Sequence, residues 1–156
     1  MDDIQYFLAT EKDTSLVLDM RMRFAEEYSG KQTDEQIAIA TDSLTKYFSR
    51  ELNNNYLCWY ATVNGELASI GGVVLRISPG STRNPSGIWG YIMNVYTKPE
   101  YRRRGLSLAI MDKLIATGRE HGITAFELHA TLQGEQVYIK SGFELFNEPT
   151  YRKFFG

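Results

Sequence analysis

The chain has 156 residues, 43% of them hydrophobic and 23% charged, which predicts one globular domain spanning residues 1–156. A net charge of −2 and the absence of any apolar run near ~20 residues argue against a nucleic-acid binder and a membrane-spanning protein. One cysteine and two histidines without clustered spacing predict no internal disulfide and no metal site, and they agree with a cytoplasmic protein.

The N-terminal segment predicts a strand followed by a helix. Apolar and polar residues alternate over residues 4–9, which favours an opening strand. Thr14 or Ser15 is a candidate cap for a helix that runs to about Tyr28. The Ser29-Gly30 pair ends this helix.

A second helix is predicted from Thr33 to about Arg50. Thr33 with Gln36 has the spacing of a capping box, and Asn53-Asn54-Asn55 ends the pattern. The expected inner face carries Ile37, Ala40, Leu44 and Phe48.

A hairpin follows, with strands Tyr56–Val63 and Glu66–Ile77 joined by Asn64-Gly65, a strong signal for a two-residue turn. Gly71-Gly72 within the second strand predicts a bulge or a close approach of another group. Cys58 lies in an apolar run and is expected to be a buried small side chain.

The rest of the chain completes a mixed α/β order, β-α-α-β-β-β-α-β-α-β-β. The predicted ranges are a loop Ser78–Gly87, a strand Ile88–Thr97, a helix Arg104–His121, a strand Thr124–Thr131, a short helix Gly134–Ser141, and a terminal hairpin of Phe143–Phe146 with Tyr151–Phe155.

The connection between strand Ile88–Thr97 and the long helix predicts an anion site. It holds Arg102, Arg103, Arg104 and Gly105 directly before the helix. The first amides of a helix have no intrahelical acceptor, and the helix dipole adds partial positive charge. Such a turn favours a phosphate or pyrophosphate, although a solvated basic corner would have the same residues.

Two motifs carry a resemblance to a known superfamily. Arg102-x-x-Gly105-x-Ser107 resembles the acyl-CoA signature of the GCN5-related N-acetyltransferases (GNAT), with a small serine in place of the usual glycine or alanine. About thirty residues later, Val137-Tyr138-Ile139-Lys140-Ser141-Gly142-Phe143 is similar to the superfamily's Leu-Tyr-x-x-x-Gly-Phe segment. The resemblance covers residues 56 to 146.

This resemblance implies a GNAT-type sheet that splays apart between the strand ending near Thr97 and the strand beginning near Thr124. It also implies acetyl-CoA as co-substrate, with the pantetheine arm lying between those strands and its amides meeting unpaired backbone groups. The cofactor-binding residues that it implies are Val95, Tyr96, Thr97, Arg102, Arg103, Arg104, Gly105, Leu106 and Ser107.

The implied reaction is acetyl transfer to a primary amine of a small molecule or protein, by direct attack on the thioester. Tyr138 matches the superfamily's general acid, since a phenol with a pKa near ~10 stays protonated at neutral pH. A tyrosine on a short helix can equally serve packing.

The general base is left open, and five residues are candidates for the acceptor side of the site. Tyr91 stands where some members carry a glutamate, and Asn94 could orient substrate or water. Glu26 or Glu27 could hold a cationic acceptor, or could be solvated carboxylates at a helix end. His129 has a suitable intrinsic pKa but could be structural.

Two other classes of protein remain to be weighed. A non-catalytic acyl-CoA-binding or sensor domain would keep Arg102–Ser107. A triphosphate-binding module would need a lysine after the glycine, whereas Leu106 and Ser107 follow Gly105. The acceptor amine is not specified by the sequence, and we allow for a homodimer.

Overall fold

The computed structural model describes residues 1–156 and has one five-stranded sheet in the order β1-β2-β3-β4-β5. All neighbouring strands are antiparallel except the parallel pair β4 and β5. The elements are β1 (Ile4–Leu8), α1 (Thr14–Ser29), α2 (Asp34–Glu51), β2 (Tyr56–Val63), β3 (Glu66–Ile77), β4 (Ile88–Thr97), α3 (Leu106–Glu120), β5 (Ala125–Leu128) and α4 (Glu135–Lys140), with 3₁₀ turns η1 (Glu11–Asp13) and η2 (Pro99–Tyr101).

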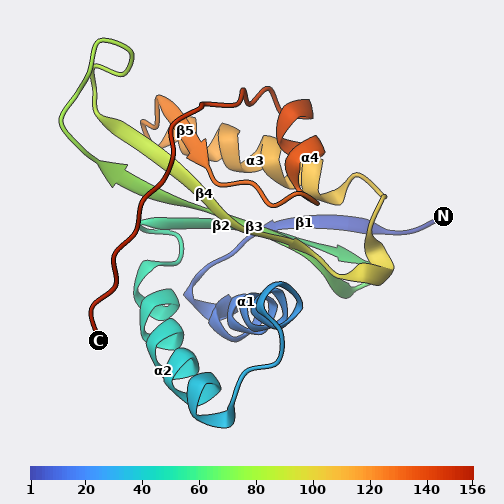
Figure 1. The fold of residues 1–156 in the computed structure, drawn as a ribbon. Coiled ribbons are helices and arrows are strands. Elements are labelled where there is room, and N and C mark those ends of the chain that lie inside the picture. The colour runs from blue at the N-terminus through green and yellow to red at the C-terminus, as the bar shows by residue number, and fades with distance from the viewer.

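The helices cover the two faces of the sheet separately. Helices α1 and α2 lie on one face, and α3 and α4 lie on the other (Figure 1). The predicted mixed α/β class is therefore confirmed. None of the helices has the length and apolar character needed to cross a bilayer.

The predicted N-terminal cap is correct for α2 and wrong for α1. Thr33 Oγ1 accepts from the Gln36 amide at 3.1 Å, and Gln36 Oε1 accepts from the Thr33 amide at 3.0 Å, so the predicted capping box forms. The prediction of Thr14 or Ser15 as the cap of α1 is wrong. The chain first makes η1, which Thr10 caps, and the Thr14 hydroxyl donates to a carbonyl of that turn at 2.7 Å.

The hairpin between β2 and β3 forms with the predicted bounds. Asn64 and Gly65 both have positive φ, 51° and 82°, as a two-residue hairpin turn of this type requires. Further along β3, the pairing with β4 shifts register, so that Asn94 and Val95 lie opposite Gly71 alone. The predicted bulge is therefore present, and β4 contains the extra residue.

Gly72 is a place of close approach as well as part of this irregularity. A Cβ at Gly72 would lie 2.0 Å from the hydroxyl oxygen of Tyr56, a fully buried side chain. Tyr56 in turn accepts a hydrogen bond from the Asn94 side-chain amide at 3.1 Å. Gly72 thus makes room for the side chain that contacts the β4 bulge.

We expect Gly72→Ala to lower the free energy of unfolding by about 1–3 kcal/mol, because the added methyl group overpacks this contact. Urea unfolding measures the change. Gly71→Ala is the matched comparison, since its Cβ would meet side-chain methyl groups of Ile110 and Leu114 at 2.9 and 3.1 Å, which can move, and not a buried ring. Equal losses in both variants would contradict the special role of Gly72.

Two apolar cores fill the spaces on the two faces. The core on the α3 face includes Leu57, Val73, Ile92, Ile110 and Leu114, and that on the α1 face includes Met20, Phe48, Tyr56, Cys58 and Ile70. Cys58 is buried as predicted, and burial raises the pKa of its thiol. The predicted inner face of α2 is buried only toward its C-terminal end, because Ile37 remains 40% exposed.

The C-terminal segment corrects the sequence analysis, because residues 141–156 form no helix or strand. The predicted hairpin of Phe143–Phe146 with Tyr151–Phe155 is absent, and β5 is shorter than the predicted Thr124–Thr131. Pro149 cannot donate to a strand ladder. The segment instead crosses the sheet toward α2 (Figure 1), with Thr150 hydrogen-bonded to His129 at 3.1 Å. Its apolar side chains stay largely exposed, up to 91% at Leu145.

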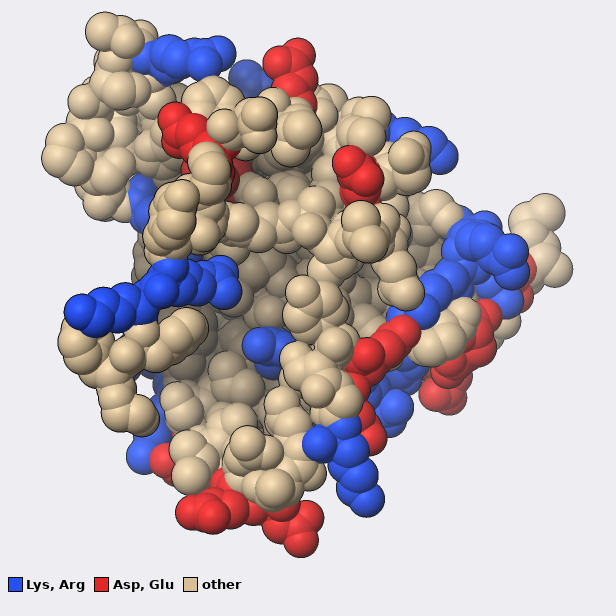
Figure 2. All heavy atoms as spheres, viewed as in Figure 1, with Lys and Arg blue, Asp and Glu red and all other residues tan.

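Charge is mixed over the surface seen in Figure 2. Lys and Arg side chains alternate with Asp and Glu around the rim, and the hollowed centre is largely uncharged. This face therefore has no extended basic surface of the kind that binds a nucleic-acid backbone.

Candidate active site

Strands β4 and β5 part halfway along β4. Their pairing runs from Trp89 with Ala125 to Ile92 with Leu128, and the rest of β4 has no strand partner on that side. The bulge lies just beyond the last pair, where Asn94 has a φ of 57°. The predicted splay is thus present, and it leaves backbone groups of β4 available to a ligand.

The turn after β4 presents the start of α3 to open space. After η2, Arg103 and Gly105 have positive φ values of 61° and 76°, and the helix begins at Leu106. A Cβ at Gly105 would meet no atom within 4 Å. The backbone conformation therefore explains the glycine, and the space before the free amides of the first helical turn is unobstructed.

The three arginines of the turn have different partners. Arg102 donates from one guanidinium nitrogen to both carboxylate oxygens of Glu27, at 2.6 and 2.7 Å, and from Nε to the Thr97 carbonyl at 2.8 Å. Arg104 pairs with Asp2 at 2.7 Å. Arg103 is exposed and has no ion pair or hydrogen bond with the protein. Arg102 and Arg104 thus brace the turn, and Arg103 is free to meet an anion.

Ser107, which departs from the usual glycine or alanine, has a structural partner. Its Oγ lies 2.7 Å from Thr97 Oγ1, which lies 2.7 Å from Ser69 Oγ. This chain of hydroxyls joins β3, the end of β4 and the first turn of α3. The serine therefore adds a tie within the turn, and Ser69 is a participant that sequence reasoning missed.

Glu26 and Glu27 lie in different surroundings. Glu26 is exposed and lines a hollow between α1 and the start of α2. Burial alone would raise the pKa of Glu27, but hydrogen bonds from Arg102 and Tyr96 and the charge of Arg102 together lower it. Burial and the neighbouring Glu27 raise the pKa of Tyr96 to about 12. These contacts tie Glu27 to the turn and give no support to its expected role with a cationic acceptor.

Tyr91 and His129 come together at the place where β4 and β5 part. Tyr91 Oη lies 2.8 Å from His129 Nδ1, although the residues are 38 positions apart in the chain. His129 directly follows β5, and its Nε2 lies 3.1 Å from Thr150 Oγ1. Asn94, by contrast, directs its amide to Tyr56. Tyr91 and His129, which the sequence analysis named separately, thus form one hydrogen-bonded pair. Asn94 instead supports the bulge of β4.

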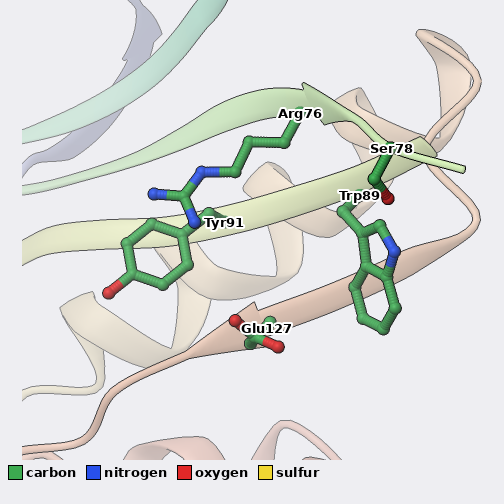
Figure 3. A pocket seen from close by; sticks show the side chains of 5 residues that line it. All are labelled: Arg76, Ser78, Trp89, Tyr91 and Glu127. Carbon is green, nitrogen blue, oxygen red and sulfur yellow. The ribbon is translucent and has the colours of Figure 1, made fainter. Parts of the chain in front are cut away.

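A hollow of about 190 Å³ lies beside this pair, lined by Arg76, Ser78, Trp89, Tyr91 and Glu127 (Figure 3). The Arg76 guanidinium stacks on Tyr91, 4.0 Å from the ring centroid. Sequence reasoning missed Arg76, Trp89 and Glu127. The signal was available in principle, because alternate residues of neighbouring strands share one face of a sheet.

Tyr138 lies on α4, on the α3 side of the sheet (Figure 1). It is half-buried, packs edge-on to Phe143 with ring centroids 6.5 Å apart, and makes no hydrogen bond with the protein through its hydroxyl. Burial raises the pKa of Tyr138, so its hydroxyl keeps its proton at neutral pH.

Thr131 accepts from the Gly134 amide at 3.2 Å, in the turn that leads into α4. No group of three or more His, Cys, Asp or Glu side chains is placed to hold a metal ion.

A family model described as an acetyltransferase (GNAT) domain matches residues 24–155, so the chain belongs to the GNAT family of N-acetyltransferases. The resemblance in the two sequence motifs is therefore confirmed. A comparison with curated proteins finds no match.

Solved structures of this fold resemble the chain over nearly its whole length. A protein from Clostridium acetobutylicum, described as a predicted acetyltransferase with acetyl-CoA, is 30% identical, with a TM-score of 0.85 and coverage of 97% of this chain and 96% of that chain. A GCN5-related N-acetyltransferase from Ralstonia eutropha JMP134 is 24% identical, with a TM-score of 0.83 and coverage of 97% and 99%. A glucosamine-6-phosphate N-acetyltransferase from Arabidopsis thaliana is 15% identical, with a TM-score of 0.64 and coverage of 99% of each chain.

Proposed function

We propose that this protein transfers the acetyl group of acetyl-CoA to a primary amine by direct attack of the amine on the thioester. One observation carries the proposal: β4 parts from β5 and then ends in an open turn with free helix amides and an unpaired arginine. The similar Clostridium acetobutylicum protein was solved with acetyl-CoA, which supports the choice of donor.

In this proposal the cofactor lies along the second half of β4. Backbone groups of Val95, Tyr96 and Thr97 pair with the amides of the pantetheine arm. The pyrophosphate is bound by the amides of Gly105, Leu106 and Ser107 together with Arg103. Arg102 and Arg104 shape the turn through their ion pairs.

The chemical step begins when the lone pair of the neutral amine attacks the thioester carbonyl carbon. The carbon–nitrogen bond forms, the carbonyl π electrons move to oxygen, and a backbone amide near the bulge stabilises that oxyanion. The carbonyl then re-forms, the carbon–sulfur bond breaks, and the thiolate takes a proton from Tyr138. Tyr138 recovers its proton from solvent, and the products are the N-acetyl amide and CoA.

The amine proton leaves through the Tyr91 and His129 pair. The Tyr91 oxygen accepts it while Tyr91 passes its own proton to His129 Nδ1, and the imidazolium then releases a proton to solvent. This relay uses the tautomer of His129 in which Nε2 carries the hydrogen and donates to Thr150. It replaces the single carboxylate base that some superfamily members have.

Calorimetry with CoA and an assay of thiol release with a panel of amines test the proposal. Intersecting initial-rate lines are expected for direct attack, because both substrates are bound before chemistry. No CoA binding at millimolar ligand would contradict the donor. Binding of acetyl-CoA without turnover for any amine would favour the alternative of a non-catalytic acyl-CoA-binding domain.

A further inference from the structure

We propose that the acceptor is a small amine that also carries an anionic group, a carboxylate or a phosphate, and that it is bound in the hollow formed by Arg76, Ser78, Trp89, Tyr91 and Glu127. This inference rests on the proposed function, because it concerns the second substrate of the same reaction.

The position of the hollow suits an acceptor site. Tyr91 pairs with Glu127 across the two strands, one register position before the last pair, Ile92 with Leu128. The hollow therefore begins where the strands part, and the Tyr91–His129 pair lies at that point. An amine held there would face an acetyl group that enters along the second half of β4.

Four of the five lining residues come from three neighbouring strands and share one face of the sheet, and Ser78 directly follows β3. Arg76 of β3 is the register partner of Trp89, and Glu127 of β5 is the partner of Tyr91. The alternate residues Ile88 and Ile92 belong to the core on the α3 face. Trp89 and Tyr91 consequently project to the opposite face, which is the α1 face.

The charges of the hollow are opposite in sign and are not paired with each other. Neither Arg76 nor Glu127 takes part in any salt bridge, whereas Arg23 and Lys46 each pair with a carboxylate on the same helix. In Figure 3 the guanidinium of Arg76 lies over Tyr91, with Trp89 and Glu127 on the neighbouring sides. A ligand with two opposite charges would satisfy both residues at once.

Each end of such a ligand has a matching group. A carboxylate or phosphate can accept two parallel hydrogen bonds from the guanidinium of Arg76. An ammonium can bind the Glu127 carboxylate and the aromatic face of Trp89 before it loses its proton. An ammonium at Glu127 lies beside Tyr91, the register partner of Glu127, while the anion is bound by the Arg76 guanidinium.

The hollow is small and partly open to solvent. At about 190 Å³ it equals roughly six water molecules at their share of ~30 Å³ in the liquid. Pockets for drug-sized ligands hold about 300–1,000 Å³. The part of an acceptor that this hollow encloses is therefore about the size of an amino acid.

The experiment is a thiol-release assay with acetyl-CoA and matched pairs of acceptors. One arm uses amino acids with increasing separation between amine and carboxylate, together with their methyl esters, which keep the amine and lose the anion. A second arm uses aminoalkyl phosphates and the corresponding amino alcohols, so that carboxylate and phosphate recognition are distinguished. We expect at least one anionic acceptor to exceed its neutral partner by roughly 10–100-fold in kcat/KM.

Three variants assign that preference to the hollow. Arg76→Gln should lower kcat/KM for the anionic acceptor by roughly 10–100-fold more than for its neutral partner, which removes the preference, since only the anion loses a contact with the guanidinium. Glu127→Gln should lower kcat/KM for both partners. Arg119→Gln, an exposed arginine of α3 on the other face of the sheet, is the matched control and should behave as the parent enzyme.

Acetyl-CoA binding by calorimetry is measured for every variant, so that misfolding and loss of the donor site are recognised. An enzyme that binds acetyl-CoA but acetylates no anionic amine better than its neutral partner would overturn the inference and leave the donor site intact. A preference that survives in Arg76→Gln with acetyl-CoA binding intact would also overturn it. Loss of acetyl-CoA binding in the parent enzyme would instead refute the proposed function.

Discussion

Tyr138→Phe is expected to lower turnover by roughly 10²–10⁴-fold, the usual range for a general acid, with acetyl-CoA affinity little changed. The reason is that the variant keeps the ring that packs on Phe143 and loses only the hydroxyl. Because that hydroxyl makes no hydrogen bond within the protein, its removal leaves no unsatisfied partner. Single-turnover and steady-state rates measure the change.

The pH profile gives an independent reading of the same residue. Burial raises the pKa of Tyr138 above the ordinary value near ~10, so the acid stays protonated through neutral pH and is lost only at higher pH. We expect an alkaline decline of turnover in the parent enzyme and no such decline in Tyr138→Phe.

Tyr6→Phe is the matched control, because Tyr6 is another half-buried tyrosine whose pKa burial raises, and it lies on β1 at the far edge of the sheet. Its turnover should equal that of the parent. Unchanged turnover in Tyr138→Phe, with chemistry shown to be rate-limiting, would assign the proton of the leaving thiolate to water or to another residue.

Gly105→Leu is expected to weaken CoA binding by about 10²-fold or more. The side chain would enter the open space in front of the α3 amides and displace the pyrophosphate from two charge-assisted hydrogen bonds of about 1.5–3 kcal/mol each. The φ of 76° adds a stability cost of roughly 1–2 kcal/mol, because a leucine rarely adopts this conformation. Calorimetry and urea unfolding separate the two effects.

Two control variants distinguish the effect of backbone strain from the effect of a side chain that fills the pyrophosphate site. Gly105→Ala has the same strain with a smaller side chain, so its loss of affinity should be less than about tenfold. Gly65→Leu changes a glycine with φ of 82° and equally open space in the hairpin between β2 and β3, and it should lose stability without losing affinity. Equal CoA affinity in all three variants would place the pyrophosphate elsewhere.

The sequence alone determined the elements that depend on neighbouring residues. Asn64-Gly65 established the bounds of β2 and β3, and Thr33 with Gln36 established the start of α2. These patterns can be interpreted without the fold because the turn and the capping box each bring residues only a few positions apart into contact. The motif at Arg102 led to the correct family, since the strand, turn and helix are consecutive in the chain.

The tertiary structure decided the features that join distant residues. Arg102 meets Glu27 from a position 75 residues away, and Tyr91 meets His129 only because β4 and β5 are parallel neighbours. The sequence predicted a terminal hairpin after α4, but a strand needs an edge to pair with, and β5 offers only Ala125–Leu128. Periodicity shows which residues can face a core, whereas packing of the whole chain decides which surfaces, ion pairs and hollows are formed.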